Sequence, residues 1–232
     1  MTITAVVLAE DNDGTNQSVY TITLGATPAA NALILVALVV KDSGGDNPPR
    51  PTVAGNSLTY VFVDETPGSD SRRVFLFRAM GASPTAGDIT VTFSNSQDIV
   101  HWAITEWSGV DTSGTDGSGA VVQSVNDEDT GTTTITVTLA AFGDATNNVS
   151  YISIGTLTGS GTRTQESGYT ELVDDSAGAV GQATAFKIGE DTSPSYDTSV
   201  TTDHYAVAVE IKAAAAAGAT DPGWFQSIGG WF

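Results

Sequence analysis

The sequence of 232 residues contains no cysteine and only eight lysines and arginines in total. The lack of cysteine excludes disulfides, thiolate zinc sites and cysteine nucleophiles. The eight basic residues stand against 27 aspartates and glutamates, which gives a formal net charge of −19. Such a field repels phosphate backbones and anionic membranes, so we expect neither nucleic acid nor a membrane as a partner.

Long apolar segments are also missing from the chain. The longest apolar run, residues 32–40, is far shorter than the roughly 20 residues that a membrane-spanning helix needs. The first four residues, Met1-Thr2-Ile3-Thr4, do not lead a basic segment into an apolar one, so no secretory signal is expected. These absences predict a soluble protein that is made in a cytoplasm.

Strand signals recur along the whole chain, with turn-forming residues between them. Residues 19–24 alternate as V-Y-T-I-T-L, while residues 32–40 form a continuous apolar run that is typical of a strand buried on both faces. No window shows a sustained apolar period of 3.6 residues with helix caps. The pattern predicts an all-β fold, a single two-layer antiparallel β-sandwich. Further strands are expected at residues 3–8, 58–63, 73–80, 89–93 and 101–107.

The second half of the chain repeats the order of the first. The segment TITL at 21–24 corresponds to TVTL at 136–139, and an apolar strand follows each of them. Near the end of each half, HWAI at 101–104 corresponds to HYAV at 204–207. The fold is therefore expected to consist of two pseudo-repeats whose strands pair as layers of one sandwich.

We predict one β-sandwich domain over residues 1–212, with pseudo-repeats at about 15–110 and 130–212. Two small separate domains are the alternative, but no linker of the needed length divides the halves. Residues 213–232 are predicted to form a small-residue linker and an extended aromatic tail that docks on a partner.

The order of the strands also carries a resemblance to known proteins. An apolar strand is followed by a short strand with Asn56-Ser57-Leu58-Thr59, an aromatic strand, the segment GDITVTF at 87–93, and a strand that ends Trp107-Ser108-Gly109-Val110. Over roughly residues 15–212 this order resembles a jelly-roll-like β-sandwich module of bacteriophage structural proteins (capsid decoration or tail) and of bacterial surface proteins. The resemblance implies a domain used for display, decoration or adhesion, and it brings no catalytic residues with it.

Catalysis would need a constellation that the sequence does not present. His101 and His204 occupy corresponding positions of the two repeats, which favours a shared structural role at the start of a strand over two active sites. The chain has no Gly-x-Ser-x-Gly elbow and no phosphate-binding glycine loop. Glu106 and Glu210 lie within expected strands, either as a carboxylate pair for glycoside hydrolysis or as outward-facing polar positions. We therefore predict a protein that is not an enzyme.

The segment DNDGTN at residues 11–16 is the best candidate for binding a small ligand. Asp11 and Asp13 place carboxylate oxygens in a tight turn with a glycine, a cluster of the kind that Ca²⁺ prefers, although the distal glutamate of an EF-hand is absent. An ordinary acidic turn is the alternative. No other cofactor is expected.

Trp102 and Trp107 lie five residues apart, so in a regular strand they point to opposite faces. One of them is expected in the core. The other is a candidate for stacking on a sugar or for packing against a neighbouring chain, unless both pack within the protein.

The last ten residues, 223–232, read GWFQSIGGWF and repeat a Gly-Trp-Phe unit beyond the last expected strand. Large aromatic side chains left in water favour aggregation, so they need an apolar receptor. We predict that this tail docks on a neighbouring subunit or a larger assembly, with the domain's own surface as the alternative. The expected docking residues are Trp224, Phe225, Ile228, Trp231 and Phe232.

Together these features favour a non-enzymatic structural protein of a virus particle, most specifically a phage capsid decoration or cement protein on the virion surface. Its expected partners are neighbouring subunits, in a homotrimer, and the major capsid protein. A tail-fibre or receptor-binding component is the alternative within this class. A calcium-assisted carbohydrate-binding or adhesion module is the alternative from another class.

Overall fold

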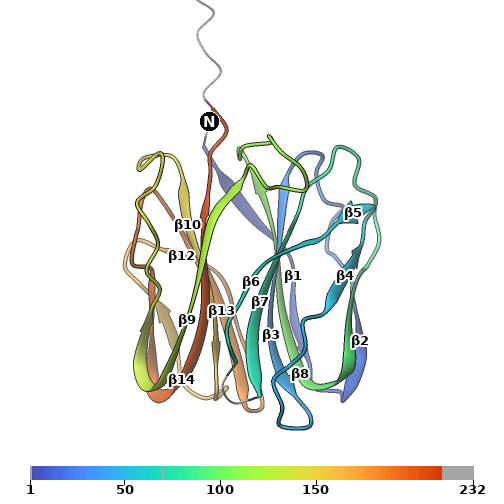
Figure 1. The fold of residues 1–232 in the computed structure, drawn as a ribbon, viewed down its shortest axis with the longest axis vertical. Coiled ribbons are helices and arrows are strands. Elements are labelled where there is room, and N and C mark those ends of the chain that lie inside the picture. The colour runs from blue at the N-terminus through green and yellow to red at the C-terminus, as the bar shows by residue number, and fades with distance from the viewer. Residues whose placement is uncertain (1, 69–70, 216–232) are drawn as a thin grey trace, which may run out of the picture.

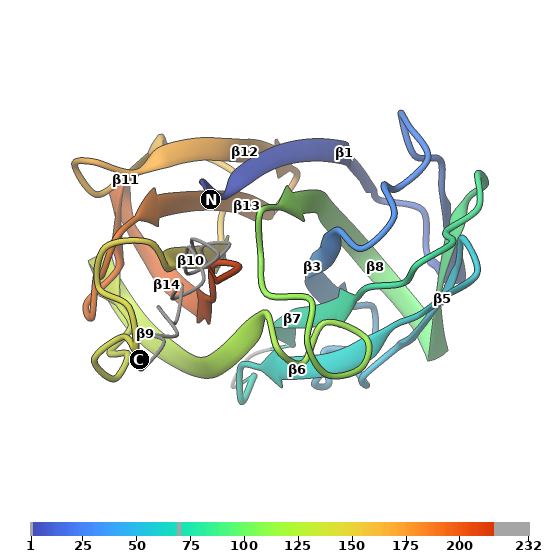
Figure 2. The same ribbon diagram turned by 90° about the horizontal axis from the view of Figure 1, so that it is seen from above.

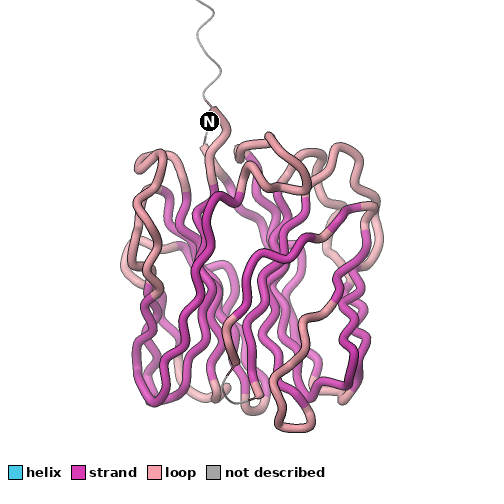
Figure 3. The backbone as a smooth tube through the Cα atoms, viewed as in Figure 1, coloured by secondary structure: helices cyan, strands magenta, loops and turns pink. Residues whose placement is uncertain are grey.

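The protein is built from antiparallel β-strands in the computed structural model, which describes residues 2–68 and 71–215 (Figure 1). These residues form fourteen strands (Figure 3). They contain no helix that is long and apolar enough to cross a membrane. The strands are β1 (Thr4–Asp13), β2 (Gln17–Ile22), β3 (Leu33–Asp42), β4 (Thr52–Gly55), β5 (Leu58–Thr59), β6 (Val61–Glu65), β7 (Arg72–Ala79), β8 (Ile89–Ser108), β9 (Val121–Thr136), β10 (Val149–Thr156), β11 (Arg163–Gln165), β12 (Thr170–Ala177), β13 (Val180–Ile188) and β14 (Ser195–Ile211).

Each half of the chain builds one sheet, and the two sheets have the same strand order. The first sheet runs β5-β4-β8-β3-β7-β6, with β1 and β2 also paired to β8. The second runs β11-β14-β10-β13-β12, with β9 also paired to β14. The central strands β8-β3-β7 therefore correspond to β14-β10-β13, and β1 with β2 corresponds to the long β9. This recurrence confirms the predicted fold class, an all-β antiparallel sandwich built from two pseudo-repeats.

The strands β3 and β10 lie at the centres of their sheets, and their sequences explain the position. Every residue of β10 is buried, and so is every residue of β3 except Lys41. Alternate residues of β3 face different cores, with Leu35 and Ala37 on one side and Ile34 and Val36 on the other. An unbroken apolar run is required here because both faces of the strand are covered.

The two sheets enclose three layers of apolar side chains. The central core lies between the sheets and combines side chains from both halves, among them Leu35, Trp107 and Tyr151. Each sheet also curls around a core of its own, which contains Phe77 in the first half and Ile152 in the second. Figure 2 shows the result as a closed oval in which each half wraps its own interior. Because the central core draws on both halves, burial of apolar surface holds them together.

The long strands β8 and β14 produce the curl of each sheet. The first part of β8 pairs with β2 and β4, and its second part pairs with β1 and β3. The first part of β8 thereby encloses the core of the first half, and its second part also faces the central core between the two sheets. In the second half the register of β14 against β9 shifts between Asp197 and His204. Irregularities of this kind bend a strand.

Two seams join the edges of the sheets, as Figure 2 shows. At one seam β1 lies beside β12, and at the other β6 lies beside β9. Across each seam an asparagine amide donates a hydrogen bond of 2.9 Å to an aspartate, from Asn12 to Asp175 and from Asn126 to Asp64. These bonds fix the position of one half against the other.

Candidate functional site

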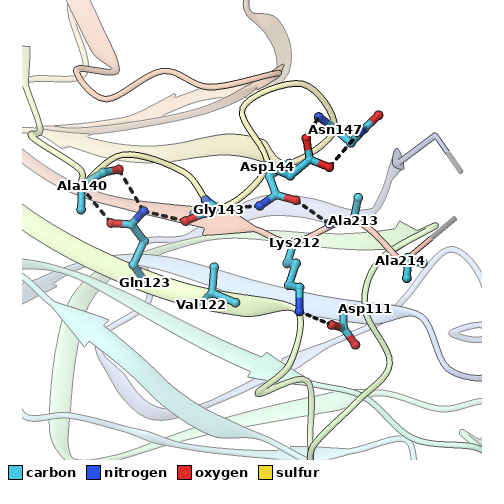
Figure 4. Close-up of a pocket in the computed structure, with 13 residues that line it drawn as sticks. Asp111, Val122, Gln123, Ala140, Gly143, Asp144, Asn147, Lys212, Ala213 and Ala214 are labelled. Atoms are coloured by element: carbon cyan, nitrogen blue, oxygen red, sulfur yellow. Dashed lines mark hydrogen bonds and ion pairs between the residues drawn. The ribbon is translucent and has the colours of Figure 1, made fainter.

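A pocket of about 710 Å³ opens at the end of the fold where β14 finishes (Figure 4). Its wall comes from the start of β9, from the loop before β10 and from the residues that follow β14. A volume of this order is enough for a small molecule or for a few large side chains. The lining residues are Asp111, Val122, Gln123, Ala140, Gly143, Asp144, Asn147, Asn148, Glu210, Lys212, Ala213, Ala214 and Ala215.

A buried carboxylate holds the floor of this pocket together. Glu210, near the end of β14, accepts hydrogen bonds from the side-chain amides of Gln123 at 2.6 Å and Asn148 at 2.5 Å, and from the N–H of Gly143 at 3.3 Å. Asn148 in turn accepts the backbone N–H of Ala213 at 3.0 Å. A carboxylate can be buried only where such donors replace water. The network therefore fixes β9, the loop before β10 and the end of β14 against one another.

The rim of the pocket carries charged side chains that are already paired. Lys212 forms an ion pair of 2.7 Å with Asp111. Hydrogen bonds from Lys212 and Ser113 lower the pKa of Asp111 to about 2. Hydrogen bonds from the Asn147 side chain and from the backbone of residues 146 and 147 also lower the pKa of Asp144. Both carboxylates are therefore ionised at neutral pH.

The pocket offers contacts for binding a ligand that has an apolar body and N–H groups. Val122, Ala140 and the alanines after β14 supply apolar surface, and Asp144 lines another part of the pocket, beside Asn147 (Figure 4). An aromatic ring with a polar edge, such as an indole, has this combination of properties. The lining residues that the structure describes include no histidine, serine or threonine, and Lys212 is their one lysine.

The first half contains the counterpart of Glu210. Glu106 of β8 lies opposite Ile34 of β3, as Glu210 lies opposite Ser150 of β10. The carboxylate of Glu106 accepts the N–H of Ala29, at 2.5 Å, in the loop before β3. In both halves a glutamate near the end of the last strand therefore holds the loop that enters the central strand. The expected outward-facing position is wrong for Glu210, which is buried.

The two histidines face different cores, although their sequence contexts match. His101 lies two residues from Ile99 and Ala103, which face the central core. His204 lies two residues before Ala206, which faces the core of the second half. A shift of one residue turns a strand side chain to the opposite face. The predicted correspondence between the two histidines is therefore wrong by one residue.

Both imidazoles are buried and held by neighbouring side chains. The Nδ1–H of His101 donates to Asp175 across the seam between β8 and β12 at 2.9 Å. Burial lowers the pKa of His101, and this effect outweighs the opposite effect of Asp175. His204 lies between the hydroxyls of Thr132 at 3.1 Å and Thr198 at 3.0 Å, and burial lowers its pKa as well. The two rings are neutral and contribute to the packing of the fold.

Both tryptophans of β8 are buried, and they point to opposite faces as predicted. Trp107 lies in the central core, with its ring edge-to-face against Tyr151 and Phe186, and its indole N–H donates to Thr105 at 2.9 Å. Trp102 is 9% exposed and packs in the core of the first half. Neither indole presents an open face on which a sugar ring could stack.

Asp11 and Asp13 stabilise the turn between β1 and β2. Asp13 accepts the N–H of Thr15 at 2.7 Å and the side-chain amide of Gln17 at 2.8 Å, while Asp11 accepts the N–H of Asn12 at 2.8 Å. Among residues 2–68 and 71–215, no group of three or more His, Cys, Asp or Glu is arranged to hold a metal ion. This geometry matches an ordinary acidic turn, and the calcium site stays a prediction from the sequence.

The described part of the chain ends at the rim of the pocket. The N–H of Ala213 donates to the side chain of Asn148, and the N–H of Ala214 donates to the carbonyl of Gly109 at 2.9 Å. The predicted docking residues Trp224, Phe225, Ile228, Trp231 and Phe232 follow later and lie outside the described residues. Sequence reasoning missed the pocket, because its wall comes from four separate segments. The buried Glu210 has no local sequence signal.

Comparisons with protein-family models, with curated proteins and with solved structures found no match to this chain. Three features of the molecule bear on its function: the two-sheet body, the pocket at the end of β14 and the aromatic residues that follow β14 in the sequence.

Proposed function

We propose that the protein is a non-enzymatic structural protein of a virus particle, most specifically a phage capsid decoration protein. The observation that carries this proposal is the position of the last described residues, which follow the end of β14. β14 ends at one pole of the body, and an aromatic segment follows in the sequence, at residues 223–232. A body with a peptide anchor at one pole has the two parts that decoration requires, a displayed surface and an attachment point.

The burial of the residues that catalysis would use supports a structural role. His101 and His204 are buried in two different cores, and each is hydrogen-bonded to the surrounding fold. Glu210 is buried and accepts three hydrogen bonds. A group that acts as a general acid or base has to reach a substrate proton. These side chains instead hold neighbouring strands and loops in place.

The charge of the chain supports attachment through apolar contacts. With a net charge of −19, two copies repel each other at a distance, which keeps the protein dispersed. Attachment to a neighbouring subunit or to a major capsid protein then has to come from buried apolar surface. The tail residues provide such surface, and a homotrimer remains the assembly we propose.

A tail-fibre or receptor-binding component is the second candidate, because it requires the same body and the same anchor. The carbohydrate-binding alternative is weaker, since Trp102 and Trp107 are both buried. Its calcium-assisted form is weaker still, since the carboxylate of Asp13 already accepts hydrogen bonds within its turn.

Immuno-electron microscopy tests the proposal on particles sedimented from a culture that produces the protein. Antibodies against the full chain should label the outer face of virus heads. Label on tail fibres would select the second candidate, and label confined to cell envelopes would refute a virion protein. A glycan array with and without EDTA separates the remaining class, because sugar binding that is lost with EDTA would favour an adhesion module.

A further inference from the structure

We propose that the pocket at the end of β14 is the receptor for the C-terminal aromatic segment, residues 223–232, of a second copy of this chain. The inference rests on the proposed assembly through the tail. It adds the identity of the surface on which the tail docks and of the partner that provides it.

The pocket has the size and the lining that an aromatic segment requires. Its volume is about 710 Å³, and Val122, Ala140 and Ala213 give it apolar surface. Val122 is 46% exposed, which makes it one of the few large apolar side chains left uncovered on the described body. Asp144 also lines the pocket, and a carboxylate can accept about four hydrogen bonds, one more than the three that Asp144 accepts from Thr146 and Asn147 (Figure 4). A tryptophan needs this combination of apolar contact and an acceptor for its indole N–H.

The floor of the receptor is already formed in the isolated chain. Glu210 binds Gln123, Asn148 and the backbone of Gly143, so three separate segments are held in position before a ligand arrives. Binding to a preorganised surface avoids most of the entropy cost of ordering it. A flexible glycine-containing tail can then adapt to a rigid pocket.

The linker is long enough to carry the tail to a neighbouring copy. Residues 216–222 separate the last described residue from the aromatic segment, and seven residues span at most about 25 Å when extended. β14 ends at this pole, where Ala213 pairs with Val110 and the N–H of Ala214 donates to the carbonyl of Gly109. The tail can therefore reach a second copy whose pocket lies within that distance.

Exchange of tails between copies fills the pocket of every chain and binds the aromatic segment of every chain. Each chain brings both this pocket and an aromatic segment, so reciprocal or cyclic exchange closes the assembly and covers Val122 together with the aromatic side chains of the tail. A tail that docks in the pocket of its own chain gives a monomer instead.

Two full-chain variants isolate the receptor and the ligand. The receptor variant is Val122→Glu with Gly143→Tyr, which puts a charge and a bulky ring into the pocket. A Cβ added at Gly143 meets no atom within 4 Å, so the backbone at this position has room for a side chain. The tail variant replaces the four aromatic residues of 223–232 with serine.

A matched control carries the same two changes elsewhere, Val19→Glu with Gly14→Tyr. Val19 is 45% exposed, as Val122 is 46% exposed, and a Cβ at Gly14 also meets no atom within 4 Å. These residues lie on β2 and on the turn before it, away from the pocket. Thermal unfolding of each variant checks that all of them are folded.

Native mass spectrometry and sedimentation velocity then report the assembly state. The wild-type chain and the control should form an oligomer of 23.8 kDa chains. The receptor variant and the tail variant, each alone, should associate at least about tenfold more weakly, because aromatic anchors dominate such interfaces. Mixed in equal amounts they should form a heterodimer, in which the intact tail of one occupies the intact pocket of the other.

Each contrary result has a distinct meaning. If the wild-type chain is monomeric, or if the mixture forms no heterodimer, docking in a second copy is refuted. If the tail variant loses assembly while the receptor variant keeps it, the pocket is refuted and tail-driven assembly stands. If the tail variant assembles as well as the wild type, assembly through the tail fails together with the inference.

Discussion

Removal of the Asp175 carboxylate tests how the two halves are joined. Asp175 lies on β12, at the edge of the second sheet, and it accepts hydrogen bonds from Asn12 and His101 of the first half. Burial alone would raise the pKa of this carboxyl, but the bonds from Asn12 and His101 hold that pKa below its usual range. The substitution Asp175→Ala removes the acceptor of both bonds and leaves the buried Nδ1–H of His101 without a partner.

The expected loss follows from these two bonds. A hydrogen bond to a charged acceptor contributes about 1.5–3 kcal/mol to stability. The Asp175 side chain is 28% exposed, so we take the lower value for each bond. The sum is about 3 kcal/mol, which lowers the melting temperature of a chain of this size by about 6–12 °C.

Urea and thermal unfolding, followed by near-UV and far-UV circular dichroism, measure this loss. The conservative change Asp175→Asn keeps one acceptor and should lose less, and Asp46→Ala in an exposed loop is the control. In the background of His101→Leu, the change Asp175→Ala should cost less, because both partners of the pair are then removed. Because the central core is shared, both probes should report one transition. Two separate transitions, or a loss no larger than that of Asp46→Ala, would refute the reasoning.

Three further predictions concern pH, the pocket floor and salt. Because burial lowers the pKa of His101 and His204, the unfolded chain binds more protons below its histidine pKa of about 6.5. As the pH is lowered from 7 to 5, the free energy of unfolding should therefore fall by up to about 1.4 kcal/mol per pH unit for each histidine. Urea titrations that give the same free energy of unfolding across this pH range would contradict the prediction. Glu210→Ala should lower the free energy of unfolding by about 3 kcal/mol, because it leaves the buried side-chain amides of Gln123 and Asn148 unpaired. Glu106→Ala leaves only one backbone N–H unpaired and should lower it by about 1 kcal/mol. Equal losses in thermal unfolding would contradict the difference in burial between the two glutamates. Self-association of the full chain should strengthen at high ionic strength, because salt screens the repulsion between copies of charge −19. If sedimentation velocity shows weaker self-association at high salt, ion pairs drive the assembly.

The sequence was sufficient for several elements that depend on local pattern, although the two strands expected at 89–93 and 101–107 are one continuous strand, β8. The apolar run of β3 predicted a strand buried on both faces, and the spacing of Trp102 and Trp107 predicted opposite orientations. The strand order of the second half was also visible, because corresponding segments keep their sequence even where the loops differ in length. Patterns of this kind follow from the two-residue period of a strand.

The features that depend on register and on long-range contact were not predictable. His101 and His204 share a sequence context, yet a difference of one residue places them in different cores. Asn12 and Asp175 meet across a seam although 163 positions separate them, and neither lies in a distinctive motif. Glu210 is buried because Gln123 and Asn148 supply donors from two other segments. Such contacts exist only once the sheets have packed.

The most direct test is an electron cryo-microscopy map of the full chain in its assembled state, at a resolution that shows side chains. The account predicts density for Trp224 or Trp231 beside Val122 and Asp144 of a neighbouring copy. Indoles that pack on their own chain, or that lie in solvent while the copies stay associated through other surfaces, would contradict it.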